Sequence, residues 1–205
     1  MARSLFNESP AMKDPELDRH GQRQLLALAR AAIADGSHMN DAIDLGALPA
    51  ALQRERAVFV TLMLSNALRG CIGSLVASEP LAHAVANAAR GAAHHDPRFP
   101  PLRVEEVAAM RIEISVLSEL EHVAADSRAA LLGILRPGVD GLLLEDGHYR
   151  STFLPKVWSQ LPDAGDFLSQ LLTKAGLSPD HWSPSLRVHR YTTSDFAEAN
   201  DHGSP

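Results

Sequence analysis

Apolar residues form an unbroken run at positions 57–64, and two polar residues end it. The run AVFVTLML is rich in β-branched and aromatic residues, a composition typical of a buried strand. The turn-prone pair Ser65-Asn66 follows, and the hexapeptide Leu68–Gly73 (LRGCIG) comes almost directly after it. This order predicts a β-hairpin whose second strand carries the hexapeptide.

A second strand pattern, at Met110–Leu117, alternates strictly between apolar and polar residues. Its apolar positions Ile112, Ile114 and Val116 are predicted to face a core, because side chains alternate across a strand. The pair Asp146-Gly147 between two further apolar runs is a strong hairpin signal. The remaining strands are predicted at 140–145, 148–154 and 185–192.

Between the strands, apolar residues recur three or four positions apart, which is the period of an α-helix. The helices are predicted at 14–35, 78–92, 104–109, 126–135, 155–158 and 163–174, with a weaker segment at 41–48. Hairpins separated by helices predict an α+β fold of antiparallel or mixed sheets with covering helices. We expect a single domain at residues 14–198, with flexible ends at 1–13 and 199–205.

Composition narrows the classes of function. The chain has 205 residues and a formal charge of −6, and its only lysines are Lys13, Lys156 and Lys174, so a basic face for nucleic acid is not expected. No apolar run is long enough to span a membrane. One cysteine forms no internal disulfide, which predicts a reducing, cytoplasmic location.

The hexapeptide carries the main candidate chemistry. In a regular strand Arg69, Cys71 and Gly73 share one face, so a cation, a thiol and bare backbone lie together. Glycine at Gly70 and Gly73 indicates that something approaches the backbone closely: a ligand, a neighbouring strand or a bulge. The polar row Arg111, Glu113 and Ser115 on the alternating strand has the same character, and we expect Arg69, Cys71 and Glu113 to face a common cleft.

Three interpretations use these residues. In the first, Cys71 is a nucleophile or covalent acceptor favoured by Arg69, with Glu113 as a further catalytic candidate and His94 as a weaker candidate for the base. In the second, the site binds a small anionic molecule without covalent chemistry. In that case Arg69, Gly70, Gly73, Asp96, Arg98 and Ser115 are the ligand-binding candidates. In the third, Arg69 and Glu113 form a buried structural pair beside an inert Cys71.

The proline-rich loop Asp96–Pro101 (DPRFPP) is expected to hold one shape, because each residue before a proline is restricted to extended conformations. We predict that it forms a wall of the cleft, with Asp96 or Arg98 hydrogen-bonded to the hexapeptide and Phe99 buried as an anchor. A metal site from Cys71, His94, His95 and Asp96 is chemically allowed. Because adjacent histidine side chains diverge, we predict no metal.

Several ordered segments together resemble the AMMECR family, whose bacterial and archaeal members are called AmmeMemoRadiSam system protein A. LRGCIG at 68–73 is similar to the hallmark hexapeptide of that family. It is followed by five further matching segments: DPRFPPL at 96–102, EISVL at 113–117, GVDGLLLE at 138–145, FLP at 153–155 and KAGL at 174–177 with Trp182. The chain departs from the family pattern at His94-His95, so no role for these histidines follows from the resemblance.

The resemblance implies an α+β fold in two lobes, with the hexapeptide lining a cleft between them. It implies no established reaction and no known cofactor. It does imply association with a Memo-like protein and a radical SAM enzyme, as possible partners in one pathway. Because fold and association do not determine mechanism, the chemistry has to come from the site residues.

Overall fold

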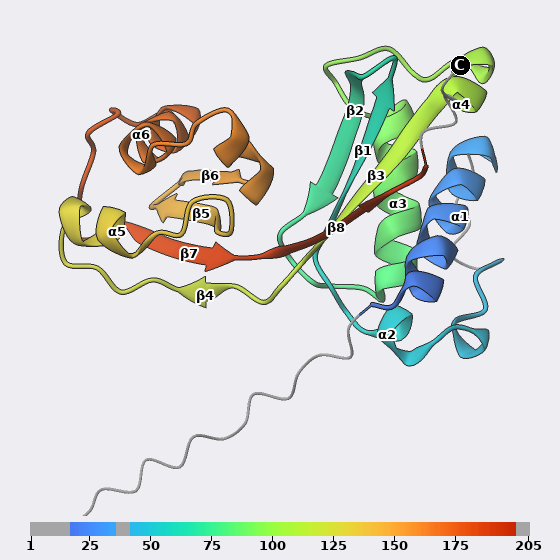
Figure 1. The fold of residues 1–205 in the computed structure, drawn as a ribbon, viewed down its shortest axis with the longest axis horizontal. Helices are drawn as coiled ribbons and strands as arrows, with labels where there is room; N and C mark the ends of the chain where they lie inside the picture. Colours follow the sequence, from blue (N-terminus) through green and yellow to red (C-terminus); the bar gives the residue numbers. More distant parts are fainter. Residues whose placement is uncertain (1–16, 36–41, 200–205) are drawn as a thin grey trace, which may run out of the picture.

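The computed structural model describes residues 17–35 and 42–199. The expected flexible end at 1–13 and the predicted helix start at Asp14-Pro15 lie outside these residues, as does the expected flexible end at 199–205 apart from Ala199. Within the described ranges the elements form two lobes, each built on one four-stranded sheet (Figure 1). Both sheets are antiparallel throughout, so the predicted α+β class is confirmed.

The first lobe contains the predicted hairpin at the edge of its sheet. Its strands are β1 (Val58–Leu64), β2 (Ala67–Ser74), β3 (Met110–Leu117) and β8 (Thr193–Ala197), in the order β2-β1-β3-β8. The turn between β1 and β2 is tight because Ser65 and Asn66 both adopt positive φ, at 50° and 63°. The hexapeptide therefore lies on an edge strand.

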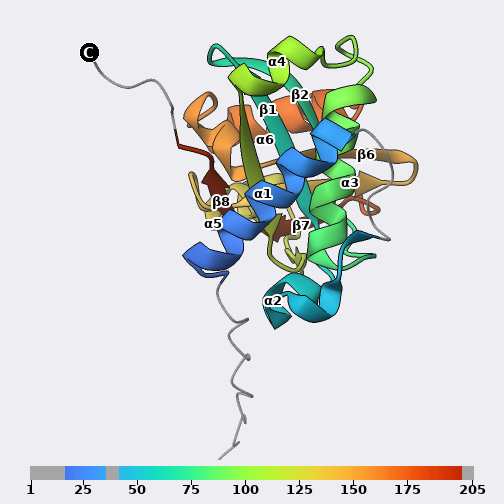
Figure 2. The same ribbon diagram turned by 90° about the vertical axis from the view of Figure 1, so that its right-hand side faces the viewer.

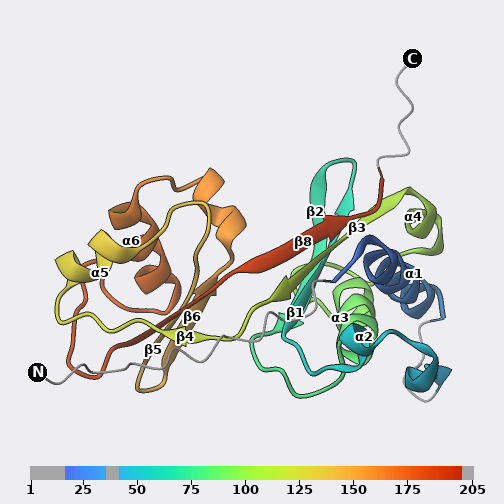
Figure 3. The same ribbon diagram turned by 60° about the horizontal axis from the view of Figure 1, so that its bottom comes forward.

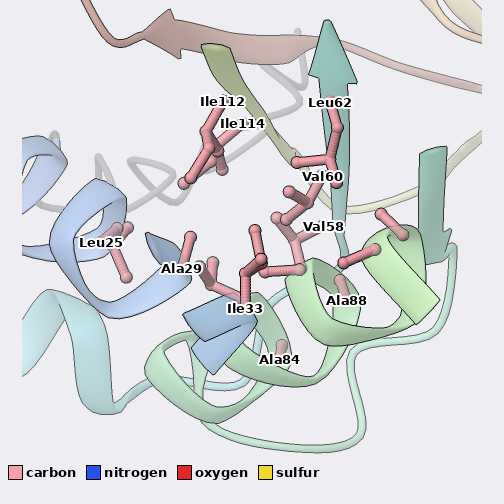
Figure 4. Close-up of a cluster of buried hydrophobic side chains, with 14 of the residues drawn as sticks. Leu25, Ala29, Ile33, Val58, Val60, Leu62, Ala84, Ala88, Ile112 and Ile114 are labelled. Atoms are coloured by element: carbon pink, nitrogen blue, oxygen red, sulfur yellow. The ribbon is translucent and has the colours of Figure 1, made fainter. Parts of the chain in front are cut away.

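Two helices, α1 (Arg19–Asp35) and α3 (Leu81–His94), cover one face of this sheet side by side (Figure 2). Leu25, Ala29 and Ile33 of α1 point toward the apolar rows of β1 and β3 (Figure 4). The small residues Ala84 and Ala88 let α3 approach the sheet closely. Thr61 and Cys71 lie on the opposite face of the sheet, where Thr61 is buried.

The second lobe has its own sheet and core. Its strands are β4 (Glu121–His122), β5 (Gly141–Asp146), β6 (Tyr149–Phe153) and β7 (Arg187–Tyr191), in the order β4-β7-β5-β6. The helices α5 (Arg128–Ile134) and α6 (Ala164–Lys174) and the 3₁₀ helix η3 (Pro155–Ser159) pack on it. At its centre Trp158 stacks on Phe167 with ring centroids 3.8 Å apart.

Three short helices complete the described chain: η2 (Leu45–Ala47), α2 (Ala50–Gln53) and α4 (Val104–Ala109). η2 lies within the weak segment predicted at 41–48, whose first residue lies outside the described ranges, and α2 follows Pro49 and was not predicted. The third has the predicted bounds and leads directly into β3. Its Glu106 contacts Arg69 of the hexapeptide.

The chain crosses between the lobes along two adjacent segments, and here the sequence reasoning missed a strand. The strand predicted at 185–192 corresponds to β7 of the second sheet, but after Thr192 the chain continues as β8 of the first sheet, which was not predicted (Figure 3). The other crossing runs from β3 to β4. Ser118 N donates to Thr192 O at 2.9 Å and Thr192 N donates to Ser118 Oγ at 2.9 Å, so the two crossings are hydrogen-bonded to each other.

Candidate functional site

The exposed edge of β2 is satisfied by side chains of the 96–101 loop. Cys71 N donates to Asp96 Oδ2 at 2.8 Å, and Arg98 Nη2 donates to Cys71 O at 3.2 Å. Arg98 also holds both oxygens of Asp96, with Nε 2.9 Å from Oδ1 and Nη2 2.7 Å from Oδ2. The loop thus takes the place of a neighbouring strand at Cys71, as the sequence predicted in part.

Asp96 is a buried carboxylate fully engaged in this contact. Its hydrogen bonds to the Arg98 guanidinium, and next those to the Cys71 and Arg98 backbone N–H groups, hold the pKa of Asp96 well below its usual range. The guanidinium side chain of Arg98 remains 53% exposed. Phe99, in contrast, is only half-buried, so its predicted role as a buried anchor was wrong. Arg98 covers its ring instead, 5.5 Å from the centroid.

Arg69 lies at a β-bulge and contacts α4 rather than β3. Leu62 pairs with Gly70 and Met63 with Leu68, so Arg69 is the extra residue of β2 and the regular alternation of side chains fails there. Its guanidinium forms a fork with Glu106, with Nε and Nη2 each 2.9 Å from a carboxylate oxygen.

Further hydrogen bonds join Arg69 to the loop, since Nη1 lies 3.0 Å from Pro100 O and Nη2 lies 3.3 Å from Pro101 O. Glu106 in turn accepts from Arg103 N at 2.8 Å. The Arg69 hydrogen bond, followed by the one from Arg103, lowers the pKa of Glu106 to about 2. Arg69 therefore fixes the loop and α4 against the hexapeptide, and the hypothesis that it pairs with Glu113 was wrong.

The two glycines of the hexapeptide are approached closely by the protein itself. A Cβ at Gly70 would lie 2.1 Å from the Ala92 carbonyl oxygen of α3, and a Cβ at Gly73 would lie 2.2 Å from Val58 O of β1. A helix backbone and a strand backbone thus occupy the space that a side chain would need. Gly73 also lines, with Ile72, a surface cavity of about 210 Å³ between β2 and α3.

Cys71 belongs to a cross-strand row on the face of the sheet away from α1 and α3. It pairs with Thr61 of β1, which pairs with Glu113 of β3. The Thr61 hydroxyl donates to Cys71 Sγ at 3.3 Å. Since neighbouring strands lie about 4.8 Å apart, Glu113 is two strands, or roughly 10 Å, from Cys71. Glu113 forms an ion pair with Arg111.

The next row of the same face contains Ser115, which is buried and pairs with Phe59 on one side and Asp195 on the other. The structure thus places Cys71 and Glu113 in one row and Ser115 in the neighbouring row. No described contact joins Glu113 or Ser115 to the thiol. The catalytic role of Glu113 and the ligand-binding role of Ser115 stay predictions.

His94 points away from the thiol. Its Nε2 lies 3.3 Å from Ile33 O at the end of α1, on the helical side of the sheet, so its proposed role as a base for Cys71 was wrong. His95 is exposed at the end of α3. Across residues 17–35 and 42–199, no group of three or more histidine, cysteine, aspartate or glutamate side chains is gathered closely enough to hold a metal ion.

Sequence reasoning missed two lysines of the second lobe, of which Lys156 contacts the row that contains Cys71. Lys156 of η3 donates from Nζ to Thr61 Oγ1 at 3.4 Å. Lys174 of α6 donates to Thr152 O at 2.9 Å and lies over the Phe153 ring. Both residues are exposed on the surface. The scarcity of lysine was the one signal that could have drawn attention to them.

The Lys174 ammonium is partly withdrawn from water although the residue is exposed. Burial of this group, and then repulsion from Arg98, lowers its pKa, while the charge of Cys71 acts in the opposite direction. The thiol of Cys71, the hydroxyl of Thr61 and the ammonium of Lys156 are thus joined by hydrogen bonds, and Arg98 beside them is paired with Asp96.

None of the helices in the described ranges has the length and apolar character needed to cross a membrane.

Comparison with known proteins places these features in a family. The AMMECR1 family model matches residues 26–196. A protein of Methanothermobacter thermautotrophicus is 40% identical over 192 residues, which cover 91% of this chain and 99% of the relative. Protein TK0174 of Thermococcus kodakarensis is 41% identical over 164 residues, 76% of this chain and 78% of the relative.

A solved structure shares the fold. The crystal structure of the uncharacterized protein PH0010 from Pyrococcus horikoshii matches with a TM-score of 0.77 and 34% sequence identity, over 88% of this chain and 93% of that one. The resemblance inferred from the hexapeptide and the segments after it is thereby confirmed. The chain belongs to the AMMECR1 family, a family of uncharacterised function.

Proposed function

We propose that this protein is a binding component that holds a small anionic molecule on the sheet face around Cys71. The observation that carries the proposal is the position of Lys156 and Lys174. They are two of only three lysines in a chain of net charge −6. Lys156 of the second lobe donates to Thr61 in the thiol-bearing row of the first, and the charge of Cys71 acts on the Lys174 ammonium. Such a local excess of positive charge favours an anion.

The electrostatics of Lys174 support the same proposal. Burial and the neighbouring Arg98 guanidinium lower the pKa of Lys174, and the charge of Cys71 offsets them only in part. An anion bound between Lys174 and Lys156 would supply further compensating negative charge. Arg69 is not needed for this role because Glu106 already occupies its guanidinium fork. The anion-binding group of the earlier hypothesis is therefore revised from Arg69 and Arg98 to the two lysines, with Arg98 at the rim.

The proposal extends to partners. On the basis of family resemblance, we propose that the bound molecule passes to or from a Memo-like protein and a radical SAM enzyme in the cytoplasm, where a reducing environment keeps the single Cys71 as a thiol. Sedimentation of the purified chain with each partner, with and without pyrophosphate, tests this step. Co-sedimentation with neither partner would contradict it.

The binding proposal is tested by isothermal titration calorimetry with inorganic phosphate and pyrophosphate at low salt. Lys156→Ala and Lys174→Ala should each weaken pyrophosphate binding by about tenfold or more, since a charge-assisted hydrogen bond is lost. Arg23→Ala is the matched control, because it removes one positive charge from the exposed side of α1. Equal affinities for all four proteins, or no binding by the wild type, would refute the proposal.

One observation favours a second function, a cysteine-dependent enzyme. The Thr61 hydroxyl donates to Cys71 Sγ, and Lys156 donates to the same hydroxyl oxygen, so a negative charge on sulfur would be stabilised through a short relay. We expect slow iodoacetamide labelling of the folded protein and a Cys71→Ser variant that still binds pyrophosphate. Rapid labelling, with a pH midpoint below that of free cysteine, would favour the enzyme instead.

A further inference from the structure

A cavity of about 420 Å³ lies where the second lobe meets strand β8 of the first. Its volume falls within the range of small-molecule sites. Its walls come from the loop before β5, from η3 and the residues after it, and from β8. The lining side chains that matter here are Pro137, Pro155, Pro162, Trp158, Lys156 and Asp195.

The apolar walls of this cavity are held in place before any ligand binds. Proline rings have no rotamer freedom to lose, and two contacts hold the Trp158 side chain. Its indole Nε1 donates to Asp140 O at 2.6 Å, and its ring stacks on Phe167. The Asp140 carboxylate is fully buried and accepts from Arg136 N at 2.9 Å, which fixes the loop. A rigid apolar pocket costs little to fill.

Lys156 connects the cavity to the row that contains Cys71. It lines the cavity, and its Nζ is the atom that lies 3.4 Å from Thr61 Oγ1. Asp195 stands on the same sheet face, one row along, paired with Ser115. Its carboxylate accepts from the Thr193 hydroxyl at 2.6 Å. The cavity therefore has one cation toward the thiol and one anion on β8.

We propose that the ligand of the Cys71 site is an amphipathic acid, with a flat apolar ring in this cavity and a single anionic group at Lys156. This inference rests on the proposed function and names its ligand class. The prolines and Trp158 take the ring, Lys156 pairs with the acid, and Asp195 repels a second negative charge on the ring. Inorganic anions would occupy only the lysine end.

The test compares phenyl phosphate with inorganic phosphate by calorimetry on the full chain. Phenyl phosphate should bind at least about tenfold more tightly, because its ring leaves water. Ser159→Phe places a ring at the cavity wall and should remove this advantage without changing inorganic phosphate binding. Ser159→Ala is the matched control, since it loses the same hydrogen bond to Lys156 O and leaves the cavity open.

The role of Asp195 has its own readout. The wild type should bind 4-carboxyphenyl phosphate more weakly than phenyl phosphate, and Asp195→Asn should reduce the difference. Equal affinities of phenyl phosphate and inorganic phosphate would overturn the inference and leave the proposed function standing. Binding of neither anion would overturn both. A phenyl phosphate advantage that survives Ser159→Phe would place the ring elsewhere and also overturn the inference.

Discussion

Replacing Gly70 by alanine tests whether the hexapeptide glycine serves packing or a ligand. The added Cβ would lie 2.1 Å from the Ala92 carbonyl oxygen. An ordinary contact between heavy atoms is about 3.5 Å, so α3 and β2 would have to separate by roughly 1.4 Å. Both neighbours are backbone, and α3 is packed against α1 as well as the sheet, so neither can yield alone.

The expected cost follows from this overlap. Overpacking a core typically costs about 1–3 kcal/mol, and a clash between two backbones belongs at the upper end. Alanine in place of glycine returns about 0.5–1 kcal/mol of chain entropy. We therefore expect Gly70→Ala to lower the free energy of unfolding by about 2–2.5 kcal/mol, or the melting temperature by about 4–10 °C.

Urea unfolding followed by far-ultraviolet circular dichroism measures this change, since α1 and α3 dominate the helical signal of the first lobe. Gly133→Ala is the control: it lies in α5 with no heavy atom within 4 Å of an added Cβ, and should be neutral or stabilising by up to about 1 kcal/mol. If Gly70→Ala has the urea midpoint and the m-value of the wild type, the packing explanation fails. The close approach to Gly70 would then be better explained by a ligand.

Three shorter predictions concern the hydrogen bonds around the hexapeptide and between the lobes. The pKa of Asp96 is lower in the folded than in the unfolded chain, so the stabilisation of the fold by its carboxylate is full above the unfolded value near pH 4 and is lost as the pH falls. In urea titrations, Asp96→Asn should therefore be less stable than the wild type at pH 7 but should lose less stability between pH 5 and pH 2. Arg69→Lys keeps the charge but cannot form the fork with Glu106, so its melting temperature should fall; an unchanged value would contradict the role given to the fork. Ser118→Ala removes the acceptor of the Thr192 N–H, so exchange of that amide should accelerate by about five- to tenfold, and unaltered exchange would show that the crossing is held by other contacts.

Elements with a clear period were predictable from sequence. The bounds of α4 and β3 agree with the prediction, because the change from helical spacing to strict alternation at Met110 is sharp. The boundary between β7 and β8 was not predictable. Arg187 to Ala197 continues as extended chain without a glycine or proline, and only the separate pairing partners of the two strands divide it.

Only part of the candidate site was predictable from the sequence. The binding of Asp96 to the hexapeptide followed from a stiff, polar loop. The partner of Arg69 did not, because a bulge displaced the side chain from the regular alternation and two glutamates were available by charge. Lys156 reaches Thr61 across 95 residues of sequence and from another lobe, and no periodicity encodes such a contact.

The place of β8 has a consequence for synthesis of the chain on the ribosome. β8 pairs with β3, yet the whole second lobe is translated between them. While that lobe emerges, Glu113–Leu117 of β3 presents an unpaired edge that any other nascent strand can join. The first sheet closes only when the last described strand leaves the exit tunnel, so slow translation or a stall within residues 118–192 should favour misassembled chains, and a chaperone that covers the β3 edge should reduce them.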